Sequence, residues 1–79
     1  MFYVYILRSE KDGKRYIGFT SNIDRRLLEH HTGYVTSTKN RRPLQLIHSE
    51  EFSNKIEAEQ REKFFKSGRG RAELKLMGL

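Results

Sequence analysis

The apolar residues of this chain fall into short segments that are separated by polar turns. Residues 2–7 ("FYVYIL") are aromatic and β-branched with no polar alternation, which is typical of a strand covered on both faces. The Asp-Gly pair at positions 12 and 13 predicts a hairpin that joins this segment to residues 15–20 in antiparallel fashion. We therefore expect residues 2–7 to form the central strand of a sheet.

Helix and strand signals continue after the hairpin. Ser21 or Asn22 offers a side-chain oxygen as the cap of a first helix over about residues 23–32, and Gly33 closes it. Residues 33–42 are polar and predict a surface loop or a short irregular helix. Beyond Pro43, the partial alternation of residues 44–52 predicts a third strand.

The last third of the chain is predicted to be helical. Asn54 and Glu57 resemble a capping box, which opens a second helix that runs until Gly68, and a last short helix is expected over residues 71–77. The expected fold class is α+β, with a three-stranded antiparallel sheet flanked by helices in the order β-β-α-β-α-α. A chain of 79 residues has room for one domain, residues 1–79.

Charge narrows the classes of partner. Sixteen Lys and Arg against ten Asp and Glu give a net charge of +6, which favours a polyanion such as nucleic acid or an anionic membrane surface. The absence of cysteine excludes disulfides and thiolate zinc sites. The apolar start is too short for a signal peptide or a membrane span, so we expect a soluble, cytoplasmic protein with no membrane association.

A helical wheel places the candidate residues of the first helix. It predicts that His30 and Arg26 lie one turn apart at the margin of the core, while Arg25 lies in solvent. A plain surface cation and a hydrogen-bonded boundary histidine are the simpler interpretations of Arg26 and His30. The arc predicted to be buried consists of Ile23, Leu27, Leu28 and His31.

Glu62 and the tyrosines of the first two strands are the remaining candidate residues. Glu62 shares a flank of the second helix with Ala58 and Phe65, although an ordinary i,i+4 ion pair with Lys66 is the simpler interpretation. Tyr5 and Tyr16 lie on strands that the hairpin makes neighbours, so their hydroxyls are expected to point into one cleft.

These segments together resemble a known family. "VYI" at 4–6, "YIG" at 16–18, Arg26 and His30 after a capped helix start, and Glu62 within "REKFFK" resemble the GIY-YIG nuclease superfamily. The resemblance covers nearly the whole chain and is strongest to the small stand-alone bacterial members. It implies the three-stranded sheet and hydrolysis of DNA phosphodiester bonds with one divalent cation, Mg²⁺ or Mn²⁺.

The resemblance also implies roles for individual residues. Glu62 would hold the metal, and Arg26 would stabilise the extra charge of the transition state. Tyr5 or Tyr16 would position or deprotonate the attacking water, and His30 would orient that tyrosine or relay its proton. The expected phosphate contacts are Lys39, Arg41, Arg42 and Lys66.

Two positions depart from the family pattern: Val4 replaces the glycine of the first motif, and no asparagine follows Glu62. Two functions are compatible with this pattern. One is a metal-dependent DNA endonuclease, structure-selective or nonspecific, that acts in DNA repair or processing. The other is a noncatalytic nucleic-acid-binding module on the same scaffold.

Overall fold

The computed structural model describes residues 1–79 and contains one three-stranded antiparallel sheet. Its strands are β1 (Phe2–Ser9), β2 (Arg15–Thr20) and β3 (Leu44–Phe52), in the spatial order β2-β1-β3. The prediction that the first segment forms the central strand is confirmed. In the hairpin, Tyr5 pairs with Gly18, and Arg8 pairs with Arg15 at the end of the ladder.

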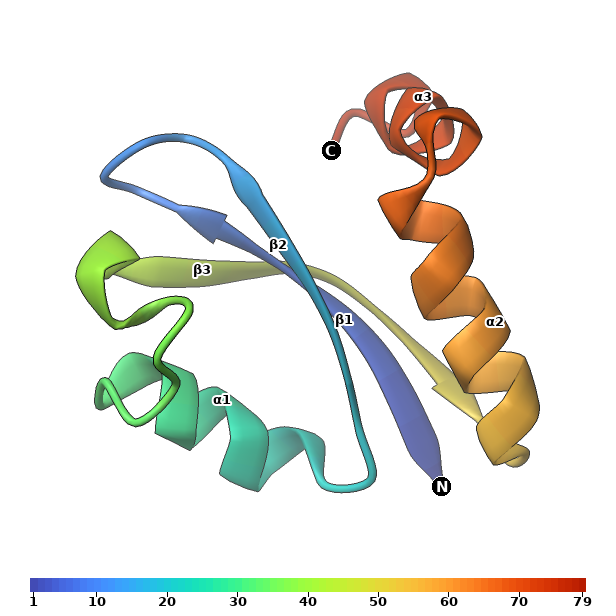
Figure 1. The fold of residues 1–79 in the computed structure, drawn as a ribbon, viewed down its shortest axis with the longest axis horizontal. Coiled ribbons are helices and arrows are strands. Elements are labelled where there is room, and N and C mark those ends of the chain that lie inside the picture. The colour runs from blue at the N-terminus through green and yellow to red at the C-terminus, as the bar shows by residue number, and fades with distance from the viewer.

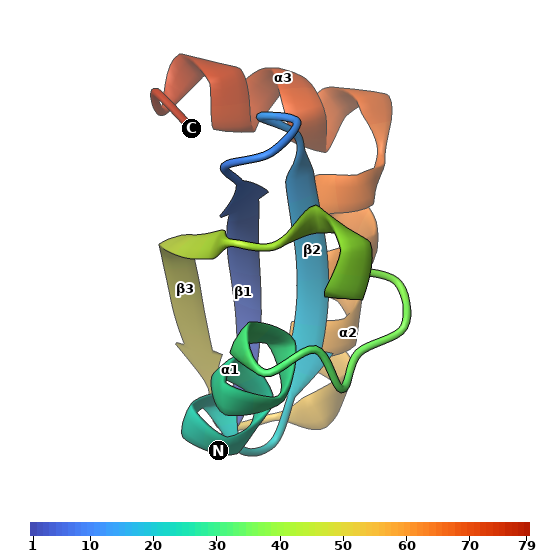
Figure 2. The same ribbon diagram turned by 90° about the vertical axis from the view of Figure 1, so that its left-hand side faces the viewer.

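The helices cover both faces of the sheet. α1 (Ile23–His31) lies on one face, α2 (Lys55–Lys66) lies on the other, and α3 (Gly68–Leu76) crosses one end (Figures 1 and 2). A short 3-10 helix, η1 (Lys39–Arg41), precedes β3. The α+β class and the order β-β-α-β-α-α are thus confirmed. None of the three α-helices combines the length and the apolar character that crossing a bilayer requires.

Side-chain caps fix where the helices begin. Asn22, rather than Ser21, caps α1 by accepting from the backbone N–H of Arg25, and Asn54 caps α2 by accepting from Ile56 and Glu57. The prediction for the last helix was wrong at its start, because Ser67 caps α3 through the N–H of Gly70 and the helix begins at Gly68.

A bulge in β3 explains why its hydrophobic alternation is only partial. Ile6 pairs with His48 but Leu7 pairs with Leu46, so β3 has one extra residue between these pairs. Because successive side chains of a strand alternate between faces, the extra residue reverses the phase. Leu44 and Leu46 therefore lie on the α1 side, with Leu7, whereas His48 lies on the α2 side, with Ile6.

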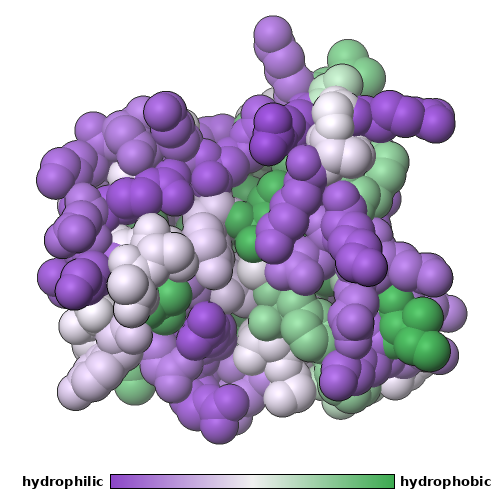
Figure 3. Space-filling view, in the orientation of Figure 1, coloured by the Kyte–Doolittle hydropathy of each residue, from purple (hydrophilic) through white to green (hydrophobic).

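The core has a part on each side of the sheet. On the α2 side, the buried residues are Val4, Ile6, Ala58, Phe65 and Leu74. On the α1 side they are Tyr5, Leu7 and Leu44, with Tyr16, Ile23 and Leu27 packed against them. In the orientation of Figure 1, hydrophilic side chains cover most of the visible surface and apolar surface is confined to separate patches (Figure 3). The side chains of Tyr5 and Tyr16 lie on the α1 side of the sheet.

Candidate active site

A buried hydrogen-bond chain links β1, α1 and the loop that follows α1. The Tyr5 hydroxyl lies 2.8 Å from His30 Nε2, and His30 Nδ1 lies 2.7 Å from Thr38 Oγ1. Tyr5 is 1% exposed, and His30 and Thr38 are fully buried. Both ring nitrogens of His30 therefore have a fixed partner, and the imidazole is locked in orientation against Tyr5.

The burial of α1 corrects the wheel prediction. His31 and Leu28 were expected to be buried, but both are exposed, and Leu28 is 62% exposed. His30, expected at the margin of the core, is buried. The stripe that faces the sheet is instead Ile23, Arg26, Leu27 and His30, which has the spacing i, i+3, i+4, i+7. The wheel prediction, which was based on hydrophobicity, missed this stripe because its most buried residue, His30, is a polar side chain with two hydrogen-bond partners.

Tyr16 completes an aromatic cluster with Tyr5 and His30. The ring centroid of Tyr16 lies 5.1 Å from that of His30 and 6.5 Å from that of Tyr5. Gly18 makes this arrangement sterically feasible, because any Cβ at that position would overlap the Tyr5 ring. Gly18 lies inside β2 rather than at its end, so its role is to leave space for the tyrosine.

Arg26 adds a positive charge to the cluster. Its Nη1 donates to Glu29 Oε1 at 3.1 Å, and the Arg26 side chain is 35% exposed, whereas the neighbouring Arg25 is exposed and has no side-chain partner. A hydrogen-bonding contribution from Tyr5 is the main cause that raises the pKa of the Arg26 guanidinium. Arg26, and not Arg25, is therefore the arginine associated with the tyrosines.

Glu62 reaches the same region from the other side of the sheet. α2 runs behind the edge strand β2 (Figure 2), and the Glu62 side chain is 22% exposed and lies 3.3 Å from Lys66 Nζ. The expected i,i+4 ion pair with Lys66 is thus present. Lys66, the partner of Glu62, lines the same hollow as Tyr16, and the Glu62 carboxylate slightly raises the pKa of Tyr5.

Burial shifts the pKa values of Tyr5 and His30 in opposite directions, and for both residues the shift favours the uncharged form. Burial raises the pKa of the Tyr5 phenol, the Arg26 guanidinium opposes this, and Tyr16 and Glu62 raise it further by smaller amounts. Burial, assisted by the charge of Arg26, lowers the pKa of His30 to about 4. At neutral pH, Tyr5 is therefore a protonated phenol and His30 a neutral imidazole.

Two cationic hollows flank the site, and no acidic residue lines either of them. The first, which we call the Tyr16 hollow, has about 550 Å³ and is lined by Gly13, Lys14, Arg15, Tyr16, Ile17, Lys66 and Arg71. The second, the Lys39 hollow, has about 580 Å³ and is lined by Lys11, His31, Lys39, Asn40, Arg42, Pro43 and Leu44. Three of the four residues predicted to contact phosphate thus line a hollow. Lys66 lines the Tyr16 hollow, and Lys39 and Arg42 line the Lys39 hollow.

The fourth predicted phosphate contact, Arg41, has several partners within the protein. Its Nε donates to Asp12 Oδ2 at 3.0 Å, and its Nη2 donates to the carbonyls of Lys14 and Arg15 at 3.0 and 3.4 Å. These bonds hold the β1–β2 turn against η1. Arg41 therefore has a structural role whether or not it also contacts DNA.

Comparison with known proteins identifies the family. The model of the GIY-YIG catalytic domain matches residues 1–75. This chain belongs to the GIY-YIG catalytic-domain family. The family is one of nuclease-type enzymes, and the five motif residues described above all lie within the matched range.

The chain is also similar to UPF0213 proteins over most of their length. The chain is 40% identical over 76 residues to a UPF0213 protein of Staphylococcus saprophyticus, covering 95% of this chain and 92% of the relative. It is 44% identical over 66 residues to a UPF0213 protein of Natronomonas pharaonis, covering 82% and 76%. The solution NMR structure of a UPF0213 protein of Bacillus halodurans matches with a TM-score of 0.61 at 36% identity, covering 98% of this chain and 85% of that one.

The candidate site includes residues that were not predicted from the sequence. Thr38 lies in a polar loop, and nothing in its local sequence indicates burial against His30. Lys14, Arg15 and Arg71 were not among the predicted phosphate contacts, although residues 61–75 contain six Lys and Arg, of which Arg71 is one. Val4, which departs from the family pattern, packs in the core on the α2 side, on the opposite face of β1 from Tyr5.

Proposed function

We propose that this GIY-YIG protein is a divalent-metal-dependent DNA endonuclease, structure-selective or nonspecific, that acts in DNA repair or processing. The observation that supports the proposal is the cluster of Tyr5, Tyr16 and His30 beside Arg26, together with Glu62, whose partner Lys66 lines the same hollow as Tyr16. A fold alone does not specify a function, but this set supplies the groups that phosphodiester hydrolysis requires.

Arg26 would bind the scissile phosphate. A guanidinium presents a planar fork of donors that matches two phosphate oxygens, and charge that develops in the transition state strengthens these bonds. In the free protein, Nη1 of Arg26 donates a hydrogen bond to Glu29, and this ion pair is partly exposed to water. A phosphate therefore has only a weak surface ion pair to displace.

The donor set fits a divalent cation that is bound largely through water and substrate. No three His, Asp or Glu side chains gather closely enough to form a complete protein cage. Mg²⁺ commonly keeps several waters and binds through one or two carboxylates plus substrate phosphate, so a lone half-buried carboxylate at Glu62 is sufficient. When bound, the ion would neutralise charge on the phosphate and acidify a coordinated water.

The two tyrosines differ in what they can do. Tyr5 is buried and its hydroxyl is held by His30, whereas Tyr16 lines a cationic hollow that opens to solvent. Tyr16 is therefore the phenol that meets the attacking water. Tyr5 lies beside Arg26 and helps to fix the orientation of the guanidinium and of the phosphate that it binds.

His30 acts as a positioning residue rather than as a proton relay. With a pKa of about 4, its imidazole is a poor acceptor for a proton from a phenol whose pKa is raised. In the tautomer with the proton on Nδ1, His30 donates to Thr38 Oγ1 and accepts from the Tyr5 hydroxyl. This tautomer leaves the oxygen of Tyr5 free to accept a bond from Arg26.

The experiment that tests the proposal compares two carboxylates of α2. Glu62→Gln should lower Mg²⁺- or Mn²⁺-dependent cleavage of branched, nicked and plain duplex DNA by about 100-fold or more, because the metal loses its protein ligand. Glu59→Gln removes the same charge from a residue that pairs with Lys55 on the exposed surface, and it should leave cleavage unchanged.

The possible outcomes separate the two functions. Cleavage that survives Glu62→Gln at the wild-type rate would remove Glu62 from the mechanism. Salt-sensitive DNA binding by the wild-type protein, with no cleavage in either metal, would favour the noncatalytic binding module instead.

A further inference from the structure

A third groove lies beside the catalytic cluster and has no role in the mechanism above. It has about 500 Å³, within the range of roughly 300–1,000 Å³ that is usual for small-ligand sites. It runs along α1 and the turn that follows. Its lining residues are Arg25, Arg26, Leu28, Glu29, Thr32 and Tyr34. Because Arg26 belongs to both, the groove is continuous with the candidate active site.

The backbone holds Tyr34 in a fixed position at the end of α1. Its N–H donates to the Glu29 carbonyl at 2.9 Å, the N–H of Gly33 donates to the His30 carbonyl at 3.3 Å, and Gly33 has a φ of +86°. This pair of backbone hydrogen bonds is a Schellman motif, in which the residue after the glycine usually packs an apolar side chain back onto the helix.

Tyr34 does not pack in that way. It is 83% exposed, and its ring takes part in none of the aromatic or cation–π contacts of the protein. Packing therefore does not account for an aromatic residue here. The result is a ring on a rigid backbone whose faces are accessible to a ligand.

The surroundings of Tyr34 are apolar on one side and cationic on the other. Leu28, 62% exposed, lines the same groove. Glu29 pairs with Arg26 at 3.1 Å, whereas Arg25 is an exposed cation with no side-chain partner. An occupant that fits this groove has a flat apolar part and an attached negative charge.

We propose that this groove binds an unpaired nucleobase of the DNA substrate, stacked on Tyr34, with the adjoining phosphate on Arg25. The proposal rests on the endonuclease function and names its substrate class. A base within a duplex is stacked on both faces and cannot reach Tyr34, whereas a base in a flap, fork or gap can. Stacking on an aromatic side chain is tolerant of sequence, so the groove selects for unpaired structure rather than for a sequence.

Cleavage of two substrates by Tyr34 variants tests the proposal. The measured quantity is the ratio of kcat/KM for a duplex with a single-stranded flap to kcat/KM for the fully paired duplex, at one salt concentration. Tyr34→Ala should lower this ratio by about 5- to 150-fold, the loss expected when one stacked base loses its platform. Tyr34→Phe, which keeps the ring, should retain it. Leu76→Ala, at an 89% exposed apolar position on α3, is the control and should not change the ratio.

A binding measurement separates this proposal from the endonuclease function. Glu62→Gln protein, which should bind without cutting, is titrated into flap DNA that carries 2-aminopurine in the flap. Quenching that Tyr34→Ala abolishes in this background supports the groove even if no cleavage is found in the wild-type protein. An unchanged ratio in Tyr34→Ala, an equal loss on both substrates, or quenching that persists without the ring would overturn the proposal.

Discussion

His30 is the residue whose chemistry the fold changes most. Its imidazole is fully buried between Tyr5 and Thr38, and burial lowers its pKa to about 4 from an ordinary value of 6.5. Protonation would add a charge next to Arg26 and remove the one acceptor nitrogen of the ring. The folded state therefore requires the neutral form, which links stability to pH.

Because the pKa of His30 is lower in the folded protein, the free energy of unfolding should fall as the pH falls. The unfolded chain takes up a proton at His30 near pH 6.5 and the folded protein only near pH 4, so falling pH favours unfolding within this window. The free energy of unfolding should be constant above about pH 7 and should fall by about 2 kcal/mol between pH 7 and pH 5. Urea denaturation at a series of pH values measures it.

The matched variant is His30→Gln, which should be less stable at pH 7 but should lose most of the slope between pH 7 and pH 5. If this variant does not fold, NMR titration of the wild-type imidazole provides the same test. An apparent pKa of His30 near 6.5 would contradict the buried neutral state. The lowered pKa values of Asp12 and Glu50 cause losses mainly at lower pH, and the chosen range limits their effect.

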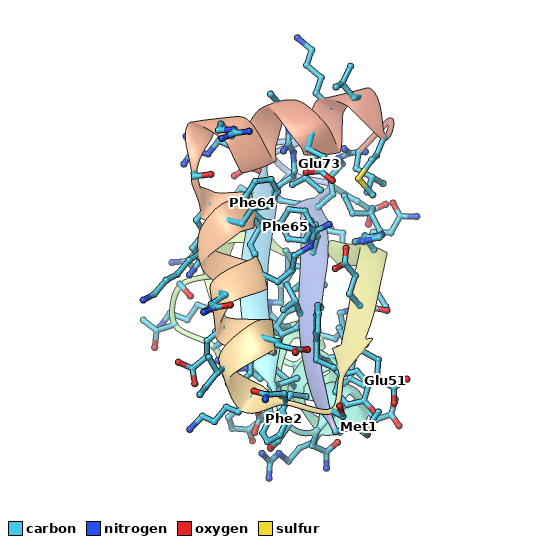
Figure 4. All side chains as sticks on the ribbon, turned by 90° about the vertical axis from the view of Figure 1, so that its right-hand side faces the viewer. Met1, Phe2, Glu51, Phe64, Phe65 and Glu73 are labelled. Carbon is cyan, nitrogen blue, oxygen red and sulfur yellow. The ribbon has the colours of Figure 1, made fainter.

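At the level of elements, Arg61 ties three of them together on the α2 side of the sheet. From α2 it donates to both carboxylate oxygens of Glu50 on β3, at 2.8 and 3.2 Å, and lies 3.6 Å from Glu73 on α3. Its guanidinium also stacks over the ring of Phe65 at 4.2 Å. Figure 4 shows Phe64, Phe65 and Glu73 where α2 meets α3.

The same contacts determine the charge of Glu50. Burial alone would raise the pKa of Glu50, but hydrogen bonds from Arg61 and His48 outweigh it and lower the pKa. The carboxylate is therefore ionised at neutral pH, and removal of Arg61 would leave that charge largely buried with only His48 beside it.

The element-level prediction compares two ion pairs of α2. Arg61→Met should lower the free energy of unfolding by about 1–3 kcal/mol, since it leaves a half-buried carboxylate without its main partner. Lys55→Ala, which breaks an exposed i,i+4 pair of 3.9 Å, should cost less than about 0.5 kcal/mol. Urea denaturation measures both, and equal losses would show that the Arg61 contacts do not hold the elements together.

Across the whole molecule, the net charge of +6 is distributed unevenly. Acidic residues such as Glu29, Glu50 and Glu62 are each paired with a nearby cation. The Tyr16 hollow and the Lys39 hollow contain only cations among their charged lining residues. Since phosphate contacts release counterions, the two hollows are the surfaces expected to make DNA affinity depend on salt.

The whole-molecule prediction is a change in that salt dependence. Arg71→Gln in the Tyr16 hollow and Lys39→Gln in the Lys39 hollow should each reduce the slope of log K against log salt by about 0.9, the value for one lost phosphate contact. Lys55→Gln removes a cation that lines neither hollow and should leave the slope unchanged. Fluorescence anisotropy with a labelled duplex measures the slopes, and equal effects of all three variants would mean that net charge alone drives binding.

Most of the fold could be predicted because its signals are local. The apolar first strand, the caps Asn22 and Asn54, and Gly33 with its positive φ each specify the conformation of a few adjacent residues. The turn residues predicted the hairpin but not its register. A two-residue Asp12–Gly13 loop would pair Tyr5 with Thr20, whereas the turn is longer and Tyr5 pairs with Gly18. Within this longer turn, Asp12 accepts a hydrogen bond from Arg41, which comes from a distant segment.

Local signals were enough to predict the elements and their order, because periodicity, caps and turn residues act over a few positions, whereas the five motif residues were assigned from the resemblance to the GIY-YIG superfamily. The folded structure was needed to see that His30 rather than His31 is buried, that Thr38 orients it, and that Gly18 makes room for Tyr5. These facts depend on contacts between residues far apart in the chain. A polar side chain enters a core only where such contacts replace its bonds to water.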